Sequence, residues 1–296
     1  MSRRREWTRG LSLGFTALAA LTFLGMLALF GVESLPVWRA EGLGYFLGKR
    51  WFYRIHDFGI LPMIYGTLAV SAVALIVAAP LGIGTALFTV EVLPRRARLA
   101  LKTAVELLAG IPSVVYGLLG VLLLRDWVYR LLTPWEPLSG DTLLTGGLLL
   151  AVMTLPTVMT LADDALSGVS ASQRLAARAL GLTRAETAVQ VGLRQGFPGL
   201  VSAVLLGLGR ALGETIAVFL VIGRQDNQWP ERLLSMPPLA SAGQTLTTKL
   251  GGSETFIANG DPLHWGAVMG LAFVLFAVVA AVSLLGARLA TWGGNA

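Results

Sequence analysis

The pattern of apolar and polar positions divides the chain into six long apolar segments joined by shorter polar ones. A helix needs about 20 mostly apolar residues to cross the hydrocarbon core of a bilayer, and each segment approaches or exceeds that length. The segments are about 11–32, 61–90, 103–124, 142–162, 199–223 and 263–289. We therefore predict an all-α polytopic membrane protein with six transmembrane helices in one domain, 11–289.

Proline and glycine mark weak points within these predicted helices. The second segment is long for one straight crossing, so we expect a kink at Pro80 or an extension beyond the bilayer. Pro156 interrupts the fourth segment, and Pro112 lies in the third. Glu106 precedes Pro112 near the basic end of the same segment, and both are candidates for gating. The alternative for Glu106 is an interfacial carboxylate that reaches the headgroups.

The charges between the segments predict the orientation. If the N-terminus is cytoplasmic, the inner side carries more Lys and Arg than the outer side, 13 against 9, as the positive-inside rule requires. The basic N-terminus (1–10), the polar segment 163–198 and the C-terminus are then cytoplasmic. The loop 224–262 is then periplasmic.

Composition supports a membrane protein and excludes several chemistries. Of the 296 residues, 55% are hydrophobic and 14% charged, and the mean hydropathy is +0.70, outside the range of soluble globular proteins. Without cysteine there is no disulfide, thiolate metal site or cysteine nucleophile. The two histidines are too far apart in sequence for a metal motif, so we expect no metal. The net charge of +6 follows from the orientation and does not indicate nucleic acid; the expected surroundings are the lipid bilayer.

The fifth segment carries Arg210 and Glu214 within an apolar run. On one continuous helix, residues four apart lie on the same face, so the two would form one polar site near the middle of the bilayer. Ionisable groups at that depth cost at least about 2.5 to 3.5 kcal/mol unless they face a bundle interior or water, which indicates a pathway. A structural ion pair is the alternative. Gly209 and Gly213 form a G-x-x-x-G step that favours close backbone packing.

The segment 163–198 predicts a helix, a turn and a second helix, at about 171–180 and 184–195. Ser170 to Gln173 and Thr183 to Glu186 both fit capping boxes, and Gly181 is suited to a left-handed turn. We expect Gly196 and Pro198 to close the second helix. The first helix has an arginine face and an apolar face, the latter formed by Leu175, Ala176, Ala179 and Leu180.

A short amphipathic helix of this kind is a docking element for a cytoplasmic partner. An alternative is a helix pair lying on the headgroups, with its arginines attracted to anionic lipid. A DNA-binding helix-turn-helix has similar local features, but this pair is tethered between two spans.

This region resembles the EAA loop of ABC importer permeases, which reads roughly E-A-A, three residues, G, nine residues, I-x-L-P. Here the pattern is Leu175-Ala176-Ala177, then Gly181, then Val191-Gly192-Leu193. Leu175 replaces the family's glutamate and Arg194 its proline, so contacts by these two positions do not carry over.

Four further stretches resemble the permeases of phosphate ABC importers. They are FGILPMIYGTL (58–68), PLGIGTALFTVEVLP (80–94), ELLAGIPSVVYGLLG (106–120) and GRALGETIAV (209–218). The last is closer to the PstC-type subunit than to its PstA-type partner. The resemblance covers about 58–223 and implies the MetI-like permease fold.

The resemblance implies a non-catalytic subunit in the bacterial inner membrane. Its partners would be two cytoplasmic ATPase subunits, a second, PstA-like permease and a periplasmic phosphate-binding protein. No G-x-x-x-x-G-K-[ST] motif occurs, so we expect no cofactor on this chain and ATP use by the partner. The phosphate pathway would involve Arg210, Glu214 and the adjacent Thr215. Coupling to the ATPase would involve Ala176, Ala177, Arg178 and Gly181.

Three other functions remain open from the sequence. A permease for sulfate, molybdate or another oxyanion is the nearest, because the EAA spacing does not specify the solute. A stand-alone secondary anion transporter would need no ATP. A membrane enzyme would need a nucleophile and a base within reach, and we find no such arrangement in the sequence.

Overall fold

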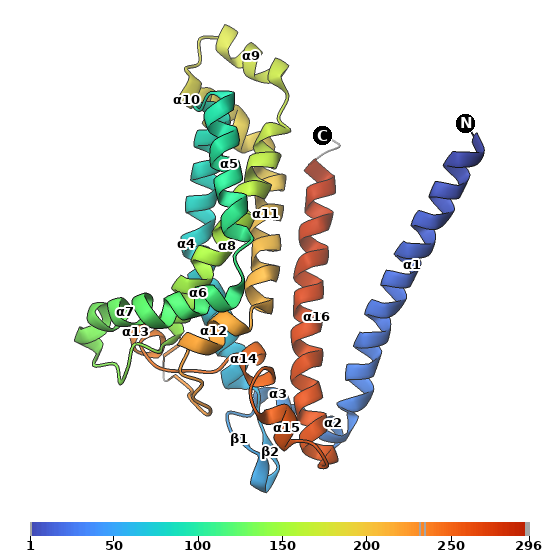
Figure 1. The fold of residues 1–296 in the computed structure, drawn as a ribbon, viewed down its shortest axis with the longest axis vertical. Helices are drawn as coiled ribbons and strands as arrows, with labels where there is room; N and C mark the ends of the chain where they lie inside the picture. The colour runs from blue at the N-terminus through green and yellow to red at the C-terminus, as the bar shows by residue number, and fades with distance from the viewer. Residues whose placement is uncertain (1, 231, 234, 294–296) are drawn as a thin grey trace.

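The computed structural model describes the backbone of residues 2–230, 232–233 and 235–293, and the side chains of residues 10–289 within these ranges. The described chain is mostly helical, with one two-stranded hairpin, which agrees with the predicted all-α class (Figure 1). Five described helices are long and apolar enough to cross a membrane, or up to six if one bent pair counts as a span. The side chains of the basic segment 1–9 lie outside the described residues.

The long helices follow four of the six predicted segments closely and extend beyond most of their ends. They are α1 (Ser2–Glu33), α4 (Leu61–Glu91), α8 (Leu143–Ser167), and α16 (Pro262–Gly293), with α11 (Arg194–Gly213) covering part of a fifth. Helices α4 and α8 continue through Pro80 and Pro156 respectively, so neither proline ends its helix.

The connecting segments contain short elements. Before α4 these are α2 (Leu35–Glu41), α3 (Leu43–Leu47), β1 (Trp51–Phe52), η1 (Tyr53–Ile55) and β2 (Asp57–Phe58). Strands β1 and β2 pair antiparallel, with Trp51 opposite Phe58. Between α12 (Ile216–Val221) and α16 lie α13 (Met236–Leu239), α14 (Leu246–Leu250) and α15 (Glu254–Ile257).

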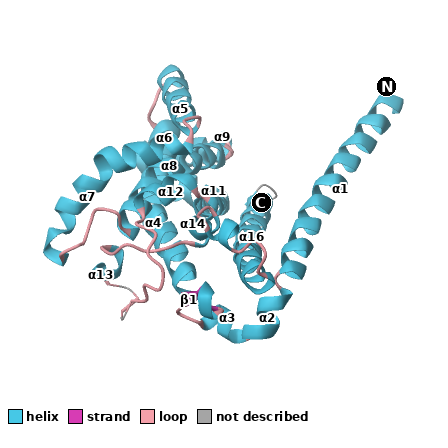
Figure 2. Cartoon of the chain, turned by 60° about the horizontal axis from the view of Figure 1, so that its bottom comes forward, coloured by secondary structure: helices cyan, strands magenta, loops and turns pink. Residues whose placement is uncertain are grey.

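The core of the bundle is formed by α4, α8 and α11. Helix α4 packs along α8, and α11 packs against both α8 and α16. Small side chains allow close contact: a Cβ added to Gly147 on α8 would lie 2.5 Å from the Cβ of Val73 on α4. Helix α1 lies at the periphery beside α16, and the apolar window of α1 buries none of its residues (Figure 2).

The two ends of the bundle differ in character. Helices α9 (Ala171–Ala179) and α10 (Arg184–Thr187) lie at the end where α1 begins and α16 ends (Figure 1). At the opposite end, α2, α3, the hairpin and α15 form a separate folded layer around the start of α16. The start of α1, the pair α9 and α10, and the end of α16 therefore lie at the same end of the bundle (Figure 1).

The third segment, expected as a helix over 103–124, is not one straight helix. Helix α5 (Arg95–Ala109) begins within the basic loop and ends before Pro112, and the chain then bends by 87°. It continues as α6 (Ser113–Leu119), a π-helical segment (Gly120–Leu124), α7 (Arg125–Leu132) and a final 3-10 turn (Thr133–Trp135). Pro112 interrupts the helix at this point, because it lacks an N–H donor and disfavours helical geometry in the residue before it.

The fifth segment differs from expectation at both ends. Its helix begins at Arg184, because α10 runs without interruption through a π-helical segment (η4, Ala188–Leu193) into α11. The expected closure at Gly196 and Pro198 is therefore wrong, and Pro198 lies inside the helix. At the other end, α11 ends at Gly213 and α12 begins only at Ile216.

Candidate functional site

The site begins at the break between α11 and α12. Glu214 has an extended backbone (φ −73°, ψ 127°), so it does not continue the helix that carries Arg210. The expectation that Arg210 and Glu214 share one helical face is therefore wrong. The Glu214 carboxylate instead accepts a hydrogen bond from the backbone N–H of Ala217, at 3.3 Å, in the first turn of α12.

Arg210 occupies the last turn of α11 and is exposed on the surface of this chain. Its Nη1 donates to the hydroxyl of Thr157 on α8, at 3.0 Å. Thr157 lies 14 residues from the start of α8 and 10 from its end, or about 21 Å and 15 Å at 1.5 Å per residue. The guanidinium therefore lies near the middle of a membrane-spanning helix.

An exposed arginine at this depth requires a wet path or a protein partner beside it. Arg210 does not line either of two cavities that lie in the described part of the chain. One has a volume of about 300 Å³ between the start of α4 and the 228–244 loop. The other, about 10 Å³ beside the break, is at the limit for one water molecule. A solute at Arg210 would therefore lie on an open face of this chain.

The segment 244–250 packs against the break from the predicted outer side. Thr247 Oγ1 donates to the backbone carbonyl of Glu214, at 2.9 Å. A Cβ added to Gly251 would lie 2.7 Å from the Thr215 side chain, which is half-buried. Both the backbone and the side chain of Glu214 are thus hydrogen-bonded, and the break is a defined turn rather than a frayed end.

The predicted G-x-x-x-G contact forms at one of its two glycines. A Cβ on Gly209 would lie 3.0 Å from Ser283 Oγ, so α11 approaches α16 closely there. Gly213 is exposed, with no atom of the described chain within 4 Å of an added Cβ.

The break between α5 and α6 lies next to the break between α11 and α12. Helix α6 packs on α12, where Gly117 admits the backbone of Ala217. Tyr116 on α6 donates to the carbonyl of Leu108, at 2.8 Å, and so spans its own break. The gating candidates Glu106 and Pro112 flank this break and are both exposed. The sequence analysis did not single out Tyr116 or Thr157.

The helix pair α9 and α10 has the predicted turn. Gly181 has φ 91°, the left-handed conformation, and the amide of Leu182 donates back to the carbonyl of Ala177. The capping box of Thr183 and Glu186 forms, and its hydrogen bonds from the Thr183 amide and hydroxyl lower the pKa of the Glu186 carboxyl. The capping box predicted at Ser170 does not form, because the Ser170 hydroxyl is hydrogen-bonded to the Ser172 hydroxyl instead.

Helix α9 presents two different faces. Ala177 is buried, whereas Leu175 is 65% and Leu180 83% exposed, and Ala176 is exposed beside them. On the other face, Arg174 and Arg178 contact the carboxylate of Glu91 at the end of α4. The arginines therefore face the protein rather than lipid, which weighs against the alternative of a helix pair held on the headgroups by its arginines. The apolar face is left free.

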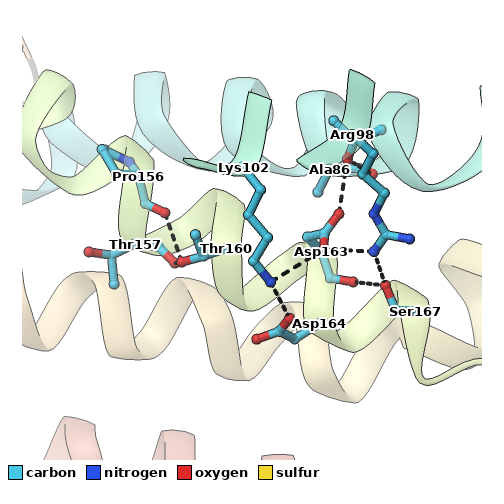
Figure 3. A network of polar contacts seen from close by, with 10 residues as sticks. Ala86, Arg98, Lys102, Pro156, Thr157, Thr160, Asp163, Asp164 and Ser167 are labelled. Atoms are coloured by element: carbon cyan, nitrogen blue, oxygen red, sulfur yellow. Dashed lines mark hydrogen bonds and ion pairs between the residues drawn. The ribbon is translucent and has the colours of Figure 1, made fainter. Parts of the chain in front are cut away.

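Carboxylates at the end of the bundle that carries α9 and α10 hold α4, α5 and α8 together. Asp163, whose side chain is 4% exposed, accepts from Arg98 at 2.7 Å and from Thr89 at 3.0 Å. Figure 3 shows Arg98 and Lys102 reaching from α5 to the acidic end of α8. The sequence analysis assigned no individual role to Asp163 or Glu91. Each of these acidic residues lies where an apolar segment meets a basic segment, and that position is the sequence feature from which the ion pairs could have been predicted.

A second buried ionic cluster lies at the opposite end. Lys249 on α14, 2% exposed, contacts Asp226 at 2.7 Å and Glu254 at 2.8 Å. Glu254 also accepts from Trp51 and is hydrogen-bonded to His264. Burial alone would raise the pKa of Glu254, but the hydrogen bond and charge of Lys249, together with the hydrogen bonds from His264 and Trp51, lower that pKa. No group of three or more His, Asp or Glu suited to a metal occurs among the described residues.

Comparisons with known proteins place this architecture in a family. Residues 78–292 match the model of the family described as "Binding-protein-dependent transport system inner membrane component". The chain is 34% identical over 277 residues to the "Probable ABC transporter permease protein YqgH" of Bacillus subtilis, covering 92% of this chain and 85% of the relative.

Further relatives carry a more specific name. The "Phosphate transport system permease protein PstC" of Xylella fastidiosa (strain Temecula1) is 31% identical over 289 residues, covering 90% of this chain and 86% of the relative. The protein of the same name from Mesorhizobium japonicum is 33% identical over 253 residues, covering 80% and 75% respectively.

Proposed function

The chain belongs to the family of binding-protein-dependent transport system inner membrane components, and on that premise we propose its specific role. It is the permease subunit of an ATP-driven importer of inorganic phosphate, spans the inner membrane several times, and catalyses no reaction itself. It conducts phosphate along the face that carries Arg210.

The exposure of Arg210 at mid-span is the observation that carries this proposal. Its Nη1 is bonded to the neutral hydroxyl of Thr157 rather than to a carboxylate, so its positive charge is available to a solute. A planar guanidinium can donate two parallel hydrogen bonds to a tetrahedral oxyanion. The Thr157 contact fixes the position of the guanidinium on the exposed face.

Glu214 and Thr215 act at the break rather than as a counter-ion to Arg210. The Glu214 carboxylate holds the first turn of α12 through the amide of Ala217. Because it is half-buried, it remains partly accessible. It is placed to accept a hydrogen bond from a protonated phosphate, which fully ionised sulfate cannot donate. Glu106 and Pro112 at the neighbouring break contribute to gating.

A second permease subunit, PstA-like, covers the open face and completes the pathway. This follows from the cost of leaving Arg210 against lipid and from the exposure of its side chain on the surface of this chain. A periplasmic phosphate-binding protein delivers the solute at the end that carries the hairpin and α15. Both termini then lie in the cytoplasm.

Two copies of a cytoplasmic ATPase provide the energy, and this chain binds neither ATP nor another cofactor. One copy docks on the exposed apolar face of α9, where Ala176 and Gly181 admit close contact and Ala177 and Arg178 anchor the helix. Because α10 is continuous with α11, a displacement of α10 moves Arg210 directly.

Reconstitution tests the solute and the energy source together. The complete complex is reconstituted in proteoliposomes together with its binding protein. It should import labelled phosphate only when ATP is supplied on the side of the membrane where the ATPase lies. Unlabelled phosphate should compete and sulfate should not. Uptake without ATP would favour a secondary transporter. Equal competition by sulfate or molybdate would favour a general oxyanion permease.

A further inference from the structure

Glu91 forms a junction between the docking helix and three other helices. It is the last residue of α4, and its side chain is 5% exposed. One oxygen, Oε1, accepts from Nη1 of Arg174 on α9, and the other lies 3.9 Å from Nη2 of Arg178. The second nitrogen of Arg174, Nη2, donates to the carbonyl of Leu166 on α8, at 2.5 Å.

The same carboxylate also faces the helix that leads to the predicted pathway. A Cβ added to Gly192 would lie 3.4 Å from Glu91 Oε1. Gly192 belongs to the π-helical segment η4 that joins α10 to α11. Such segments are uncommon and weaken the regular helix ladder, so they allow local adjustment. Glu91 therefore contacts α9 and the adjustable part of the α10–α11 helix at once.

We propose that Glu91 is a positioning residue for energy coupling, which transmits movement of α9 to α4 and α8 in parallel with the direct α10–α11 connection. The inference rests on the proposed function. It adds a route that the EAA-like segment does not contain, because Glu91 lies 84 residues before Leu175, where that segment begins.

The geometry explains why this junction matters for coupling. Helix α9 is joined to the bundle by the short segments 168–170 and 180–183, and its outer face is free. A push on that face would rotate a loosely attached helix in place. The planar guanidinium of Arg174, held by a carboxylate on α4 and a carbonyl on α8, prevents that rotation. Force on α9 then moves the ends of α4 and α8 as well.

The test compares Glu91→Gln with Asp164→Asn in the complete complex. Both variants neutralise one carboxylate at this end, but Asp164 is exposed and pairs with Lys102 instead of α9. The measurement is the number of ATP molecules hydrolysed per phosphate imported into proteoliposomes, for each purified complex. We expect at least a fivefold rise for Glu91→Gln and no change for Asp164→Asn.

A role limited to stability would reduce the yield of complex without changing that ratio. A wild-type ratio in Glu91→Gln therefore overturns the proposal, whatever the yield. Arg174→Lys, which keeps the charge and loses the planar fork, should give an intermediate ratio, and a wild-type ratio there would also contradict it. If the wild-type complex hydrolyses ATP and imports no phosphate, the proposed function fails. Import by the wild type with an unchanged Glu91→Gln ratio overturns this inference alone.

Discussion

Replacing Lys249 with methionine should loosen the predicted periplasmic layer while leaving the membrane helices intact. The substitution keeps a similar length and removes the only lysine or arginine that contacts Glu254 and Asp226 among the described ion pairs. Removing one partner of a buried ion pair costs about 3–5 kcal/mol. The Asp226 side chain is 33% exposed and can rehydrate, whereas that of Glu254 is 13% exposed. We therefore expect a loss of stability at the lower end of this range, about 3 kcal/mol.

Hydrogen exchange measures this loss locally, in residues 246–258 of the purified protein in lipid nanodiscs. A loss of about 3 kcal/mol corresponds to roughly a hundredfold faster exchange, at about 1.4 kcal/mol per factor of ten. Lys49→Met is the matched control, because Lys49 is exposed and lies over the ring of Trp229. We expect it to change protection by about 1 kcal/mol or less. Equal protection in Lys249→Met and wild type would refute the assignment of Lys249 as the centre of this layer.

The pH dependence provides a second readout of the same substitution. The pKa of Glu254 lies below its ordinary value of 4.5, so its contribution to stability is present above that value and lost as pH falls through the lowered pKa. Without Lys249, burial remains and raises that pKa. Protection of residues 246–258 should therefore fall at a higher pH in Lys249→Met than in wild type.

Three further substitutions test other parts of the account. Gly66→Ala places a Cβ 2.1 Å from the Gln244 carbonyl oxygen, so it should destabilise the contact between α4 and the outer loop by about 1–3 kcal/mol. Gly84→Ala, which has open space around the added Cβ, should not destabilise the protein. Thermal unfolding in detergent compares the two variants. Thr183→Ala removes the cap of α10 and should cost about 1 kcal/mol, seen as faster exchange at 184–188 only. Ala176→Arg on the free face of α9 should uncouple ATP hydrolysis from import with normal membrane insertion, and normal coupling would count against docking there.

Features set by local sequence were predictable. The long helices follow from apolar length, and the turn at Gly181 follows from the freedom of glycine at positive φ. The cap at Thr183 likewise depends on residues three apart. Pro112 marked the weak point in the third segment. Its 87° bend depends on the packing of α6 on α12, which no local pattern contains.

The site itself depends on contacts between distant residues. The break at Glu214 has no proline to mark it, and it is stabilised by Thr247, 33 residues away. Continuous helical spacing therefore predicted the wrong partner for Arg210. Its actual partner, Thr157, comes from α8, 53 residues earlier in the chain. The sequence pattern therefore identified Arg210 and missed Thr157, whose hydroxyl positions the guanidinium.

The most direct measurement is the initial rate of phosphate import by the Arg210→Ala complex in proteoliposomes, at saturating ATP and binding protein. Arg224→Ala is the control, because Arg224 is exposed beyond α12 and lies over the ring of Phe219. Loss of charge-assisted hydrogen bonds worth about 1.5–3 kcal/mol predicts a rate lower by roughly tenfold to a hundredfold for Arg210→Ala. The control should import at the wild-type rate. A wild-type rate in Arg210→Ala would contradict the assignment of the pathway to this arginine.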